Sequence, residues 1–325
     1  MPILCHVYRG KYVESKHVVY AVVVNGAGKI VYASGDPEYV TCIRSSLKPF
    51  QAAAVVKAGA VAAAGFSAAE LALMCASHNG EEIHVKTARS MMDKLGYPAD
   101  RYECGSHYPY HRETRESLIR TGAKPQPFHN NCSGKHAGML CLAKHLGVDP
   151  AGYTKPDHPV QEAIFHLVKT YTGLEEIPYA IDGCSAPTLF LSLRKIAGLF
   201  QTLMAGEYPE LRQVRQAMVN NPYLVAGEKR FDTDFLTALR GRAVTKVGGE
   251  AVRGIGIRTR QGETLGLALK VLDGNQRCMP AATLALLEHL DLLTPAESEH
   301  LKIYRTKKLL NHRKIHVGDI RAEIG

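Results

Sequence analysis

Two serines and a lysine lie within four residues of one another in the stretch IRSSLKPFQ, residues 43–51. A serine hydroxyl is a weak nucleophile unless a base lies within hydrogen-bond reach, and a lysine amine can be that base. Residues three apart share one face of a helix, whereas residues two apart do not. The spacing therefore selects Ser45, rather than Ser46, as the candidate nucleophile, with Lys48 as its base.

Pro49 indicates that these residues stand at the start of a helix. Proline has no amide hydrogen and is tolerated only in the first turn, where the amides have no helical partner. The positive end of the helix dipole would there stabilise an oxyanion. An apolar run follows Lys48, and burial against it favours the neutral amine. The other interpretation is that a serine simply caps the helix and that Lys48 is solvated.

Three further stretches place reactive groups next to predicted helices or strands. CASHNG (75–80) ends a helix with Ser77 and Asn79, which is also what a simple Asn-Gly turn requires. TKVGG (245–249) places Lys246 two residues before a glycine on a predicted strand, a weak signal by itself. VAGEKRFDTD (225–234) reads as a loop, either solvated or reaching a site.

The stretch HNNCSGKHAGM, residues 129–139, is the densest in polar and reactive groups. Seven such groups precede a helical pattern, which is more than capping requires and suits an anion or a small polar substrate. YAIDGCSAPT (179–188) adds Asp182, which could orient a cation or bind a substrate amine. Its Cys184 could pair with Cys132 as a thiolate metal ligand, although two distant cysteines are more often only buried thiols.

Length, composition and cysteine pattern limit the classes of protein to which the chain can belong. With 325 residues, 46% hydrophobic and 22% charged, the chain can bury a core as one large domain or as two sub-domains. The eight cysteines are scattered without a CxxC pair and predict buried thiols rather than disulfides. No signal-peptide pattern and no bilayer-length apolar run are found, so we expect a soluble cytoplasmic protein without a membrane partner.

The formal net charge of +9 raises the question of nucleic acid. Six cations and no acids lie in residues 301–316. A nucleic-acid footprint is expected to recur over a face of the protein, so we expect no nucleic-acid partner and interpret the segment as a solvated helix or an oligomer contact.

The order of predicted secondary structure indicates an α/β (α+β) protein. A hairpin at 17–36 and a buried helix at 47–59 come first, and several helices then fill 67–180. A long helix at 186–206, a three-stranded meander at 243–274 and two more helices follow. This order favours an antiparallel sheet flanked by helices with an inserted helical sub-domain. We expect residues 1–64 and about 181–325 to form the sheet part, and about 65–180 the insertion.

Taken together, these motifs resemble known enzymes. Ser45-x-x-Lys48, Ser77-His-Asn79 and Lys246-Val-Gly248 follow the SxxK, SxN, KxG order of serine β-lactamases, penicillin-binding proteins and glutaminases. The fragments IRSSLKPFQ, SHNGE, HNNCSGKHAGML, DGCSAPT and VAGEKRFDT resemble the rhizobial-type (class 3) L-asparaginases, the asparaginase II family. These fragments span residues 43–234, and the flanking pattern agrees over nearly the whole chain.

The resemblance implies a set of expectations. They are hydrolysis of L-asparagine to L-aspartate and ammonia through an acyl-enzyme, a serine β-lactamase/glutaminase-like fold, a homodimer and a zinc cofactor. The residues implied are the catalytic dyads Ser45–Lys48 and Ser77–Lys246, the substrate-binding residues Arg44, Asn79, His136 and Asp182, and the zinc ligands Cys132, Lys135 and Cys184. The alternatives are a glutaminase or β-lactamase-like amide hydrolase, and a zinc–thiolate binding or sensor protein.

Overall fold

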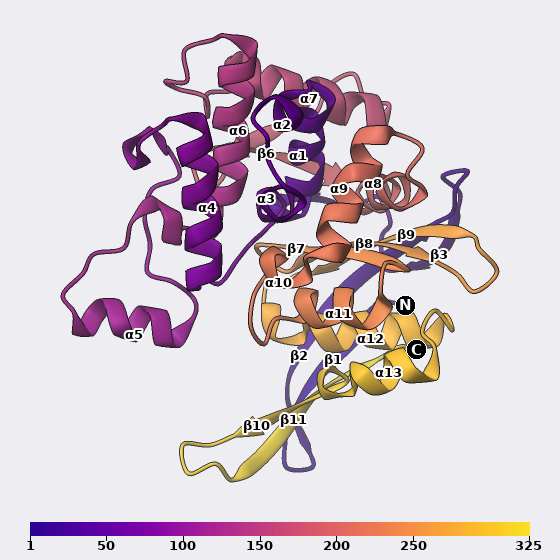
Figure 1. The fold of residues 1–325 in the computed structure, drawn as a ribbon. Coiled ribbons are helices and arrows are strands. Elements are labelled where there is room, and N and C mark those ends of the chain that lie inside the picture. The colour runs from indigo at the N-terminus through magenta and orange to yellow at the C-terminus, as the bar shows by residue number, and fades with distance from the viewer. The chain divides into compact units, whose positions relative to one another are not determined.

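The computed structural model describes all residues from 1 to 325, and the chain forms two compact units (Figure 1). Residues 1–46, 191–205 and 237–325 form one unit, here called the sheet unit. Residues 47–190 and 206–236 form the other, the helical unit. No helix has the length and apolar character needed to cross a membrane.

The sheet unit is built on an eight-stranded sheet in which every neighbouring pair is antiparallel. The strand order is β10-β11-β1-β2-β9-β8-β7, with β3 also paired to β2. The strands are β1 Ile3–Arg9, β2 Tyr12–Val24, β3 Ile30–Ser34, β7 Ala243–Gly248, β8 Val252–Arg258, β9 Thr264–Val271, β10 Thr306–Leu310 and β11 His316–Glu323. The predicted hairpin and the predicted meander are confirmed as β2–β3 and β7–β9.

Glycines in the sheet allow helix α8, Leu193–Ala205, to lie directly on the strands. A Cβ on Gly254 of β8 would stand 1.9 Å from the Phe200 ring, and one on Gly266 of β9 would stand 2.0 Å from the Ala197 carbonyl oxygen. Helix α12, Met279–His289, packs instead on β1 and β11. Gly254 and Gly266 thus mark the positions where α8 approaches the backbone of the sheet.

The helical unit is organised around α1, Lys48–Lys57, whose first eight residues are all buried. Helix α1 contacts α6, α7 and α9, and α3 contacts α6, α9 and α4. The bounds of the other helices are α2 Ala60–Ala63, α3 Ala68–Met74, α4 Glu82–Leu95, α5 Arg112–Arg120, α6 Ser133–Leu146, α7 Pro159–Thr172, α9 Pro209–Asn220 and α10 Pro222–Val225. Ser67 and Glu70 form a capping box that begins α3.

The unit boundaries differ from those expected from the sequence. The expected sheet part included residues 47–64, and the expected helical insertion ended near 180. Helix α1 lies instead in the helical unit because its partners α6, α7 and α9 are all there. For the same reason residues 206–236, which contain α9, return to that unit after α8.

The long helix predicted at 186–206 is wrong in its first third. Residues Pro187–Ser192 form strand β6, which pairs with β5, Tyr179–Ile181, and the helix begins only at Leu193. The turn at Asp182–Ser185 folds the chain back on itself, with Ser185 at a φ of 71°. Pairing with β5 satisfies backbone N–H and C=O groups in a segment whose apolar pattern predicts a helix.

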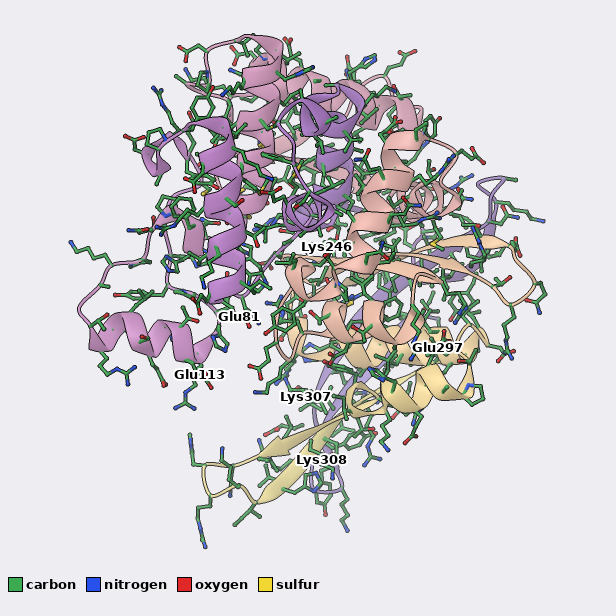
Figure 2. The ribbon with its side chains drawn as sticks, viewed as in Figure 1. Glu81, Glu113, Lys246, Glu297, Lys307 and Lys308 are labelled. Atoms are coloured by element: carbon green, nitrogen blue, oxygen red, sulfur yellow. The ribbon has the colours of Figure 1, made fainter.

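The basic segment is a hairpin rather than a solvated helix. Lys307 and Lys308 lie on β10, which pairs with β11, and both side chains are exposed (Figure 2). Only Lys302–Tyr304 forms a short 3₁₀ turn. The predicted capped helix before it is confirmed as α13, Pro295–His300. Cross-strand pairing, which periodicity within the segment does not report, decides its conformation.

The contact between α8 and the sheet yields a stability prediction. Gly254→Ala should lower the free energy of unfolding by about 2–3 kcal/mol, because the new methyl group overlaps the Phe200 ring. Gly198→Ala in α8 is the control: a Cβ there meets nothing within 4 Å, and the helix should gain about 0.5–1 kcal/mol. Urea unfolding of both variants measures this, and equal effects would contradict the packing described.

Candidate active site

The stretch 43–51 forms a 3₁₀ turn, Arg44–Leu47, followed directly by α1. Pro49 lies in the first turn of α1, as predicted. Ser46 is fully buried, and its hydroxyl donates a 2.8 Å hydrogen bond to the Lys246 carbonyl oxygen. Ser45 is only partly buried. The hydroxyl of Ser46 is therefore committed to the fold, which leaves Ser45 as the accessible serine of the pair.

The Lys-x-Gly spacing on β7 has a physical explanation within the sheet unit. A Cβ on Gly248 would stand 2.7 Å from the Ile43 carbonyl oxygen and 3.2 Å from Ser46 Oγ. Gly248 thus lets β7 approach the turn that carries Ser45. Lys246 is completely buried, and its Nζ donates to the Val247 carbonyl oxygen at 2.7 Å.

Lys48 is buried in the helical unit and has three uncharged partners. Its Nζ lies 3.1 Å from Ser77 Oγ and 3.3 Å from the Asn131 carbonyl oxygen, and it also hydrogen bonds to the Ala76 carbonyl oxygen. As an ammonium, Lys48 donates to all three. As a neutral amine it donates to the two carbonyls and accepts from the Ser77 O–H. A proton can therefore move between Lys48 and Ser77 without any other hydrogen bond being lost.

The partners of Lys48 are positioned by the packing of α6 on α3. Ala76 and Ser77 follow the end of α3, and Asn131 precedes the start of α6. A Cβ on Gly134 of α6 would stand 2.2 Å from the Leu73 carbonyl oxygen of α3. Part of the motif at 129–139 therefore serves the packing of α6 on α3.

Cys132, Lys135 and Cys184 come together in the helical unit, and all three are buried. Lys135 Nζ lies 2.9 Å from Cys184 Sγ. The hydrogen bond from the Cys132 thiol and the charge of Lys135 lower the pKa of Cys184, whereas the same contact and burial raise the pKa of Cys132. Burial alone would lower the pKa of Lys135, but the two sulfurs raise it. Of the two cysteines, Cys184 is thus the one whose ionisation the cluster favours.

This cluster fits a zinc ion by the chemistry of its donors. Zinc prefers sulfur and nitrogen ligands in a four-coordinate site, and two sulfurs and one amine nitrogen converge here. The chain contains no group of three or more His, Cys, Asp or Glu side chains that could hold a metal ion. Any such site at this position therefore depends on Lys135.

His136 and Asp182 differ in burial and in the hydrogen bonds of their side chains. His136 is fully buried, and burial lowers its pKa to about 4. Its Nδ1 is hydrogen bonded to the Tyr153 hydroxyl at 2.7 Å, and that hydroxyl also accepts from the Glu103 N–H at 2.9 Å. Asp182 is partly exposed, and its Oδ1 accepts from the Gly183 N–H at 2.6 Å. The neutral imidazole suits lining a site, and the carboxylate suits binding a cation.

The polar atoms of Asn79 are already bonded within the protein. Its Nδ2 donates to the Glu228 carbonyl oxygen at 3.0 Å and to Glu81 Oε1 at 3.3 Å. Its Oδ1 accepts from Arg230 at 2.7 Å. The sequence alone gives Glu81 no role, because Tyr223 and Glu228, which its carboxylate binds, are more than 140 residues away along the chain.

The predicted residues thus gather in two sets. Within the helical unit the structure joins Lys48 to Ser77, and Cys132 and Lys135 to Cys184. Arg44, Ser45 and Lys246 belong to the sheet unit. In that unit a Cβ on Gly249 would stand 3.1 Å from the Arg44 guanidinium carbon.

Comparison with known families decides what these sets belong to. The sequence model of the family described as L-asparaginase II matches residues 5–322. The chain belongs to the L-asparaginase II family. It is accordingly an L-asparaginase, an amidohydrolase that converts the small molecule L-asparagine into L-aspartate and ammonia.

Solved structures and curated proteins were compared as well. A β-lactamase from Sphaerobacter thermophilus DSM 20745 is 14% identical, with a TM-score of 0.44 over 86% of this chain and 93% of its own. Mglu in its native form in 4.3 M NaCl and in its tris and glutamate form is 15% and 16% identical, with TM-scores of 0.37 and 0.36 over 84% and 88% of this chain. The L-asparaginase spans 61% and 62% of those two chains. No curated protein matches.

The buried hydroxyl of Ser46 yields a second prediction. Ser46→Ala removes its hydrogen bond to the Lys246 carbonyl oxygen and should lower the free energy of unfolding by about 1–2 kcal/mol. Asparagine turnover by the folded variant should stay within about threefold of wild type, since this hydroxyl is bonded within the fold and Ser45 is the predicted nucleophile. Thermal unfolding and an ammonia-release assay measure the two effects, and complete loss of turnover in a folded variant would contradict this assignment.

Proposed function

We propose that this L-asparaginase works by Ser–Lys nucleophilic catalysis through an aspartyl-enzyme, with Ser45 as nucleophile and Lys48 as base. The observation that carries the proposal is the environment of Lys48, a buried amine whose only partners are two carbonyls and the Ser77 hydroxyl. None of these partners carries a charge, so Lys48 has hydrogen bonds but no ion pair. Ser45 stands three residues before it, with its neighbour Ser46 engaged elsewhere.

The proposed reaction has two halves. In the first, neutral Lys48 takes the Ser45 proton as Oγ attacks the side-chain amide carbon of asparagine, and backbone N–H groups at the start of α1 hold the oxyanion. Lys48 then passes the proton through the Ser77 hydroxyl to the amide nitrogen, the C–N bond breaks, and ammonia leaves. In the second, water gives a proton to Lys48 and attacks the ester. Aspartate leaves and Ser45 regains its proton.

Three further roles belong to the same proposal. Asp182 binds the α-ammonium group of the substrate, which its partly exposed carboxylate supports. Arg44 and His136 line the site. Lys246 completes a second dyad with Ser77, as the resemblance in motif order implies. Asn79 was expected to bind substrate, but its bonded amide favours a role in positioning.

We also propose that Cys132, Lys135 and Cys184 hold a zinc ion. The two sulfurs and the amine supply the donors that zinc prefers. Bound zinc supplies a positive charge and a Lewis acid at this position. In its absence Lys135 supplies the charge that stabilises the thiolate of Cys184. The proposal of a homodimer rests on the resemblance to the family.

Replacement of Ser45 tests the nucleophile. Ser45→Ala should lower the turnover of L-asparagine by at least about 10³-fold, because no other hydroxyl is expected to replace the attacking oxygen. Ser46→Ala is the matched control, since it removes the adjacent hydroxyl. Ammonia release under saturating asparagine measures both rates. A fully active Ser45→Ala enzyme, or an inactive and folded Ser46→Ala enzyme, would sink the assignment.

Metal content tests the zinc site independently of activity. Wild type loaded with zinc and freed of excess should retain about one ion per chain, whereas Cys132→Ala and Lys135→Ala should retain far less. Cys141→Ala is the control, because this buried thiol of α6 bonds only to the Ala60 carbonyl oxygen. Zinc is measured by elemental analysis. Unchanged zinc in Lys135→Ala would show that the lysine is not a ligand.

A further inference from the structure

The segment that carries Ser77 is paired with a second segment at residues 225–230. The Ser77 N–H donates to the Val225 carbonyl oxygen at 3.0 Å, and the Asn79 N–H donates to the Ala226 carbonyl oxygen at 2.9 Å. The position of Ser77 therefore depends on whatever holds residues 225–230 in place. This second segment has no regular structure between α10 and α11, Phe231–Leu239.

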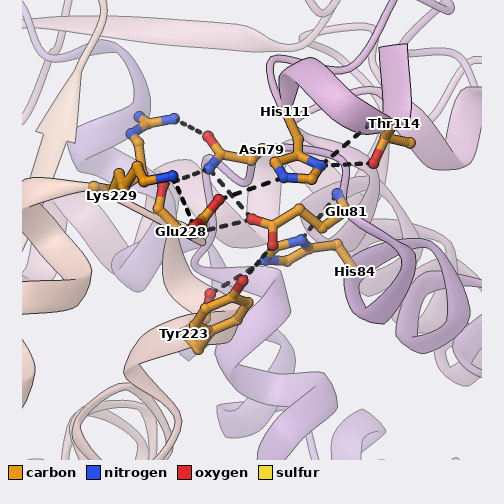
Figure 3. Close-up of polar contacts among 9 residues, drawn as sticks. Asn79, Glu81, His84, His111, Thr114, Tyr223, Glu228 and Lys229 are labelled. Carbon is orange, nitrogen blue, oxygen red and sulfur yellow. Dashed lines mark hydrogen bonds and ion pairs between the residues drawn. The ribbon is translucent and has the colours of Figure 1, made fainter. Parts of the chain in front are cut away.

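The side chain of Glu81 binds both segments at once (Figure 3). Its Oε1 accepts from the Glu228 N–H at 2.9 Å and from Asn79 Nδ2 at 3.3 Å. Its Oε2 accepts from the Tyr223 hydroxyl. Glu81 is 8% exposed. The buried Glu81 carboxylate thus connects the segment that carries Ser77 and Asn79 to a loop more than 140 residues further along the chain.

Gly227 shows how closely the loop lies on this carboxylate. Its φ is +113°, and a Cβ there would stand 2.3 Å from Glu81 Oε1 and 2.8 Å from Asn79 Nδ2. Only glycine fits both the conformation and the space. The glycine of the loop is therefore explained by the approach of its backbone to Glu81.

Electrostatics keep Glu81 ionised. Burial alone would raise its pKa, but the hydrogen bonds from Tyr223 and from the Glu228 N–H lower it. The contact with Glu81 in turn raises the pKa of Tyr223 to about 12. His84 supports the same arrangement, because its Nδ1 accepts from the Glu81 N–H at 3.2 Å and its Nε2 lies 3.2 Å from the Tyr223 carbonyl oxygen.

We propose that Glu81 is a positioning residue that acts through Asn79 and residues 225–228 to hold Ser77 against Lys48. This inference rests on the proposed role of Ser77 in passing the proton. Ser77 Oγ lies 3.1 Å from Lys48 Nζ, so a displacement of the segment by a few tenths of an ångström breaks the path of the proton. Glu81 touches neither reacting group, and its effect should appear in kcat rather than in KM.

The test compares Glu81→Ala with Glu70→Ala. Glu70 is also a buried carboxylate of the helical unit and accepts from the Ser67 N–H, Ser90 and Lys94 at 2.6–3.0 Å. Both variants should lose similar stability, but only Glu81→Ala should lower kcat for asparagine, by about 10²-fold, with KM changed little. Glu81→Gln still accepts from the Glu228 N–H, so it should recover kcat to within about tenfold of wild type.

Amide hydrogen exchange supplies a readout independent of catalysis. In Glu81→Ala the amides of Ser77, Asn79 and Glu228 should exchange faster, whereas in Glu70→Ala they should exchange as in wild type. Equal loss of kcat in the two alanine variants, or unchanged exchange at these three amides, would overturn the proposal.

A double variant separates this inference from the proposed function. If Glu81 acts through Ser77, adding Glu81→Ala to Ser77→Ala should lower kcat by less than about twofold more. A full further 10²-fold loss would show that Glu81 acts by another route and would overturn the inference. If Ser77→Ala alone kept the wild-type rate, the proposed proton path would fail instead.

Discussion

The burial of the Lys48 amine is the constraint on which the rest of the helical unit depends. A buried amine without hydrogen-bond partners costs several kcal/mol, so this lysine is tolerated only where acceptors surround it. They come from the residues after α3 and from the loop before α6. The start of α1, the residues after α3 and the loop before α6 must therefore meet around the Lys48 amine. Gly134 allows α6 to come close enough to α3 for this contact.

Two buried lysines of the same unit are stabilised in opposite ways. Lys48 faces uncharged oxygens only, whereas Lys135 faces the sulfurs of Cys132 and Cys184. Lys48 is stabilised by hydrogen bonds to neutral groups, whereas the two sulfurs raise the pKa of Lys135. The two buried lysines thus differ in the groups that surround them, although both lie in polar, glycine-containing stretches of the chain.

The close approaches in this enzyme are made by glycines that serve chemistry and packing together. Gly248 brings β7 to the turn of Ser45, and Gly227 brings the 225–230 loop to Glu81. In each case a Cβ would overlap a polar group of the site. The motifs that identify the L-asparaginase II family are therefore also packing requirements, which explains why glycine recurs beside the reactive residues.

The sequence by itself determined the family, the choice of Ser45 over Ser46 as the candidate nucleophile, and most of the local structure. Those features depend on near neighbours in the chain: a capping box at Ser67, a proline in the first turn of α1, glycine-rich turns in the meander. What only the tertiary structure decided depends on partners far along the chain. Residues 187–192 became a strand by pairing with β5, Ser46 was committed by its bond to Lys246, and Glu81 gained its role from Tyr223 and Glu228. No local pattern reports such contacts, because their free energy comes from groups that folding alone brings together.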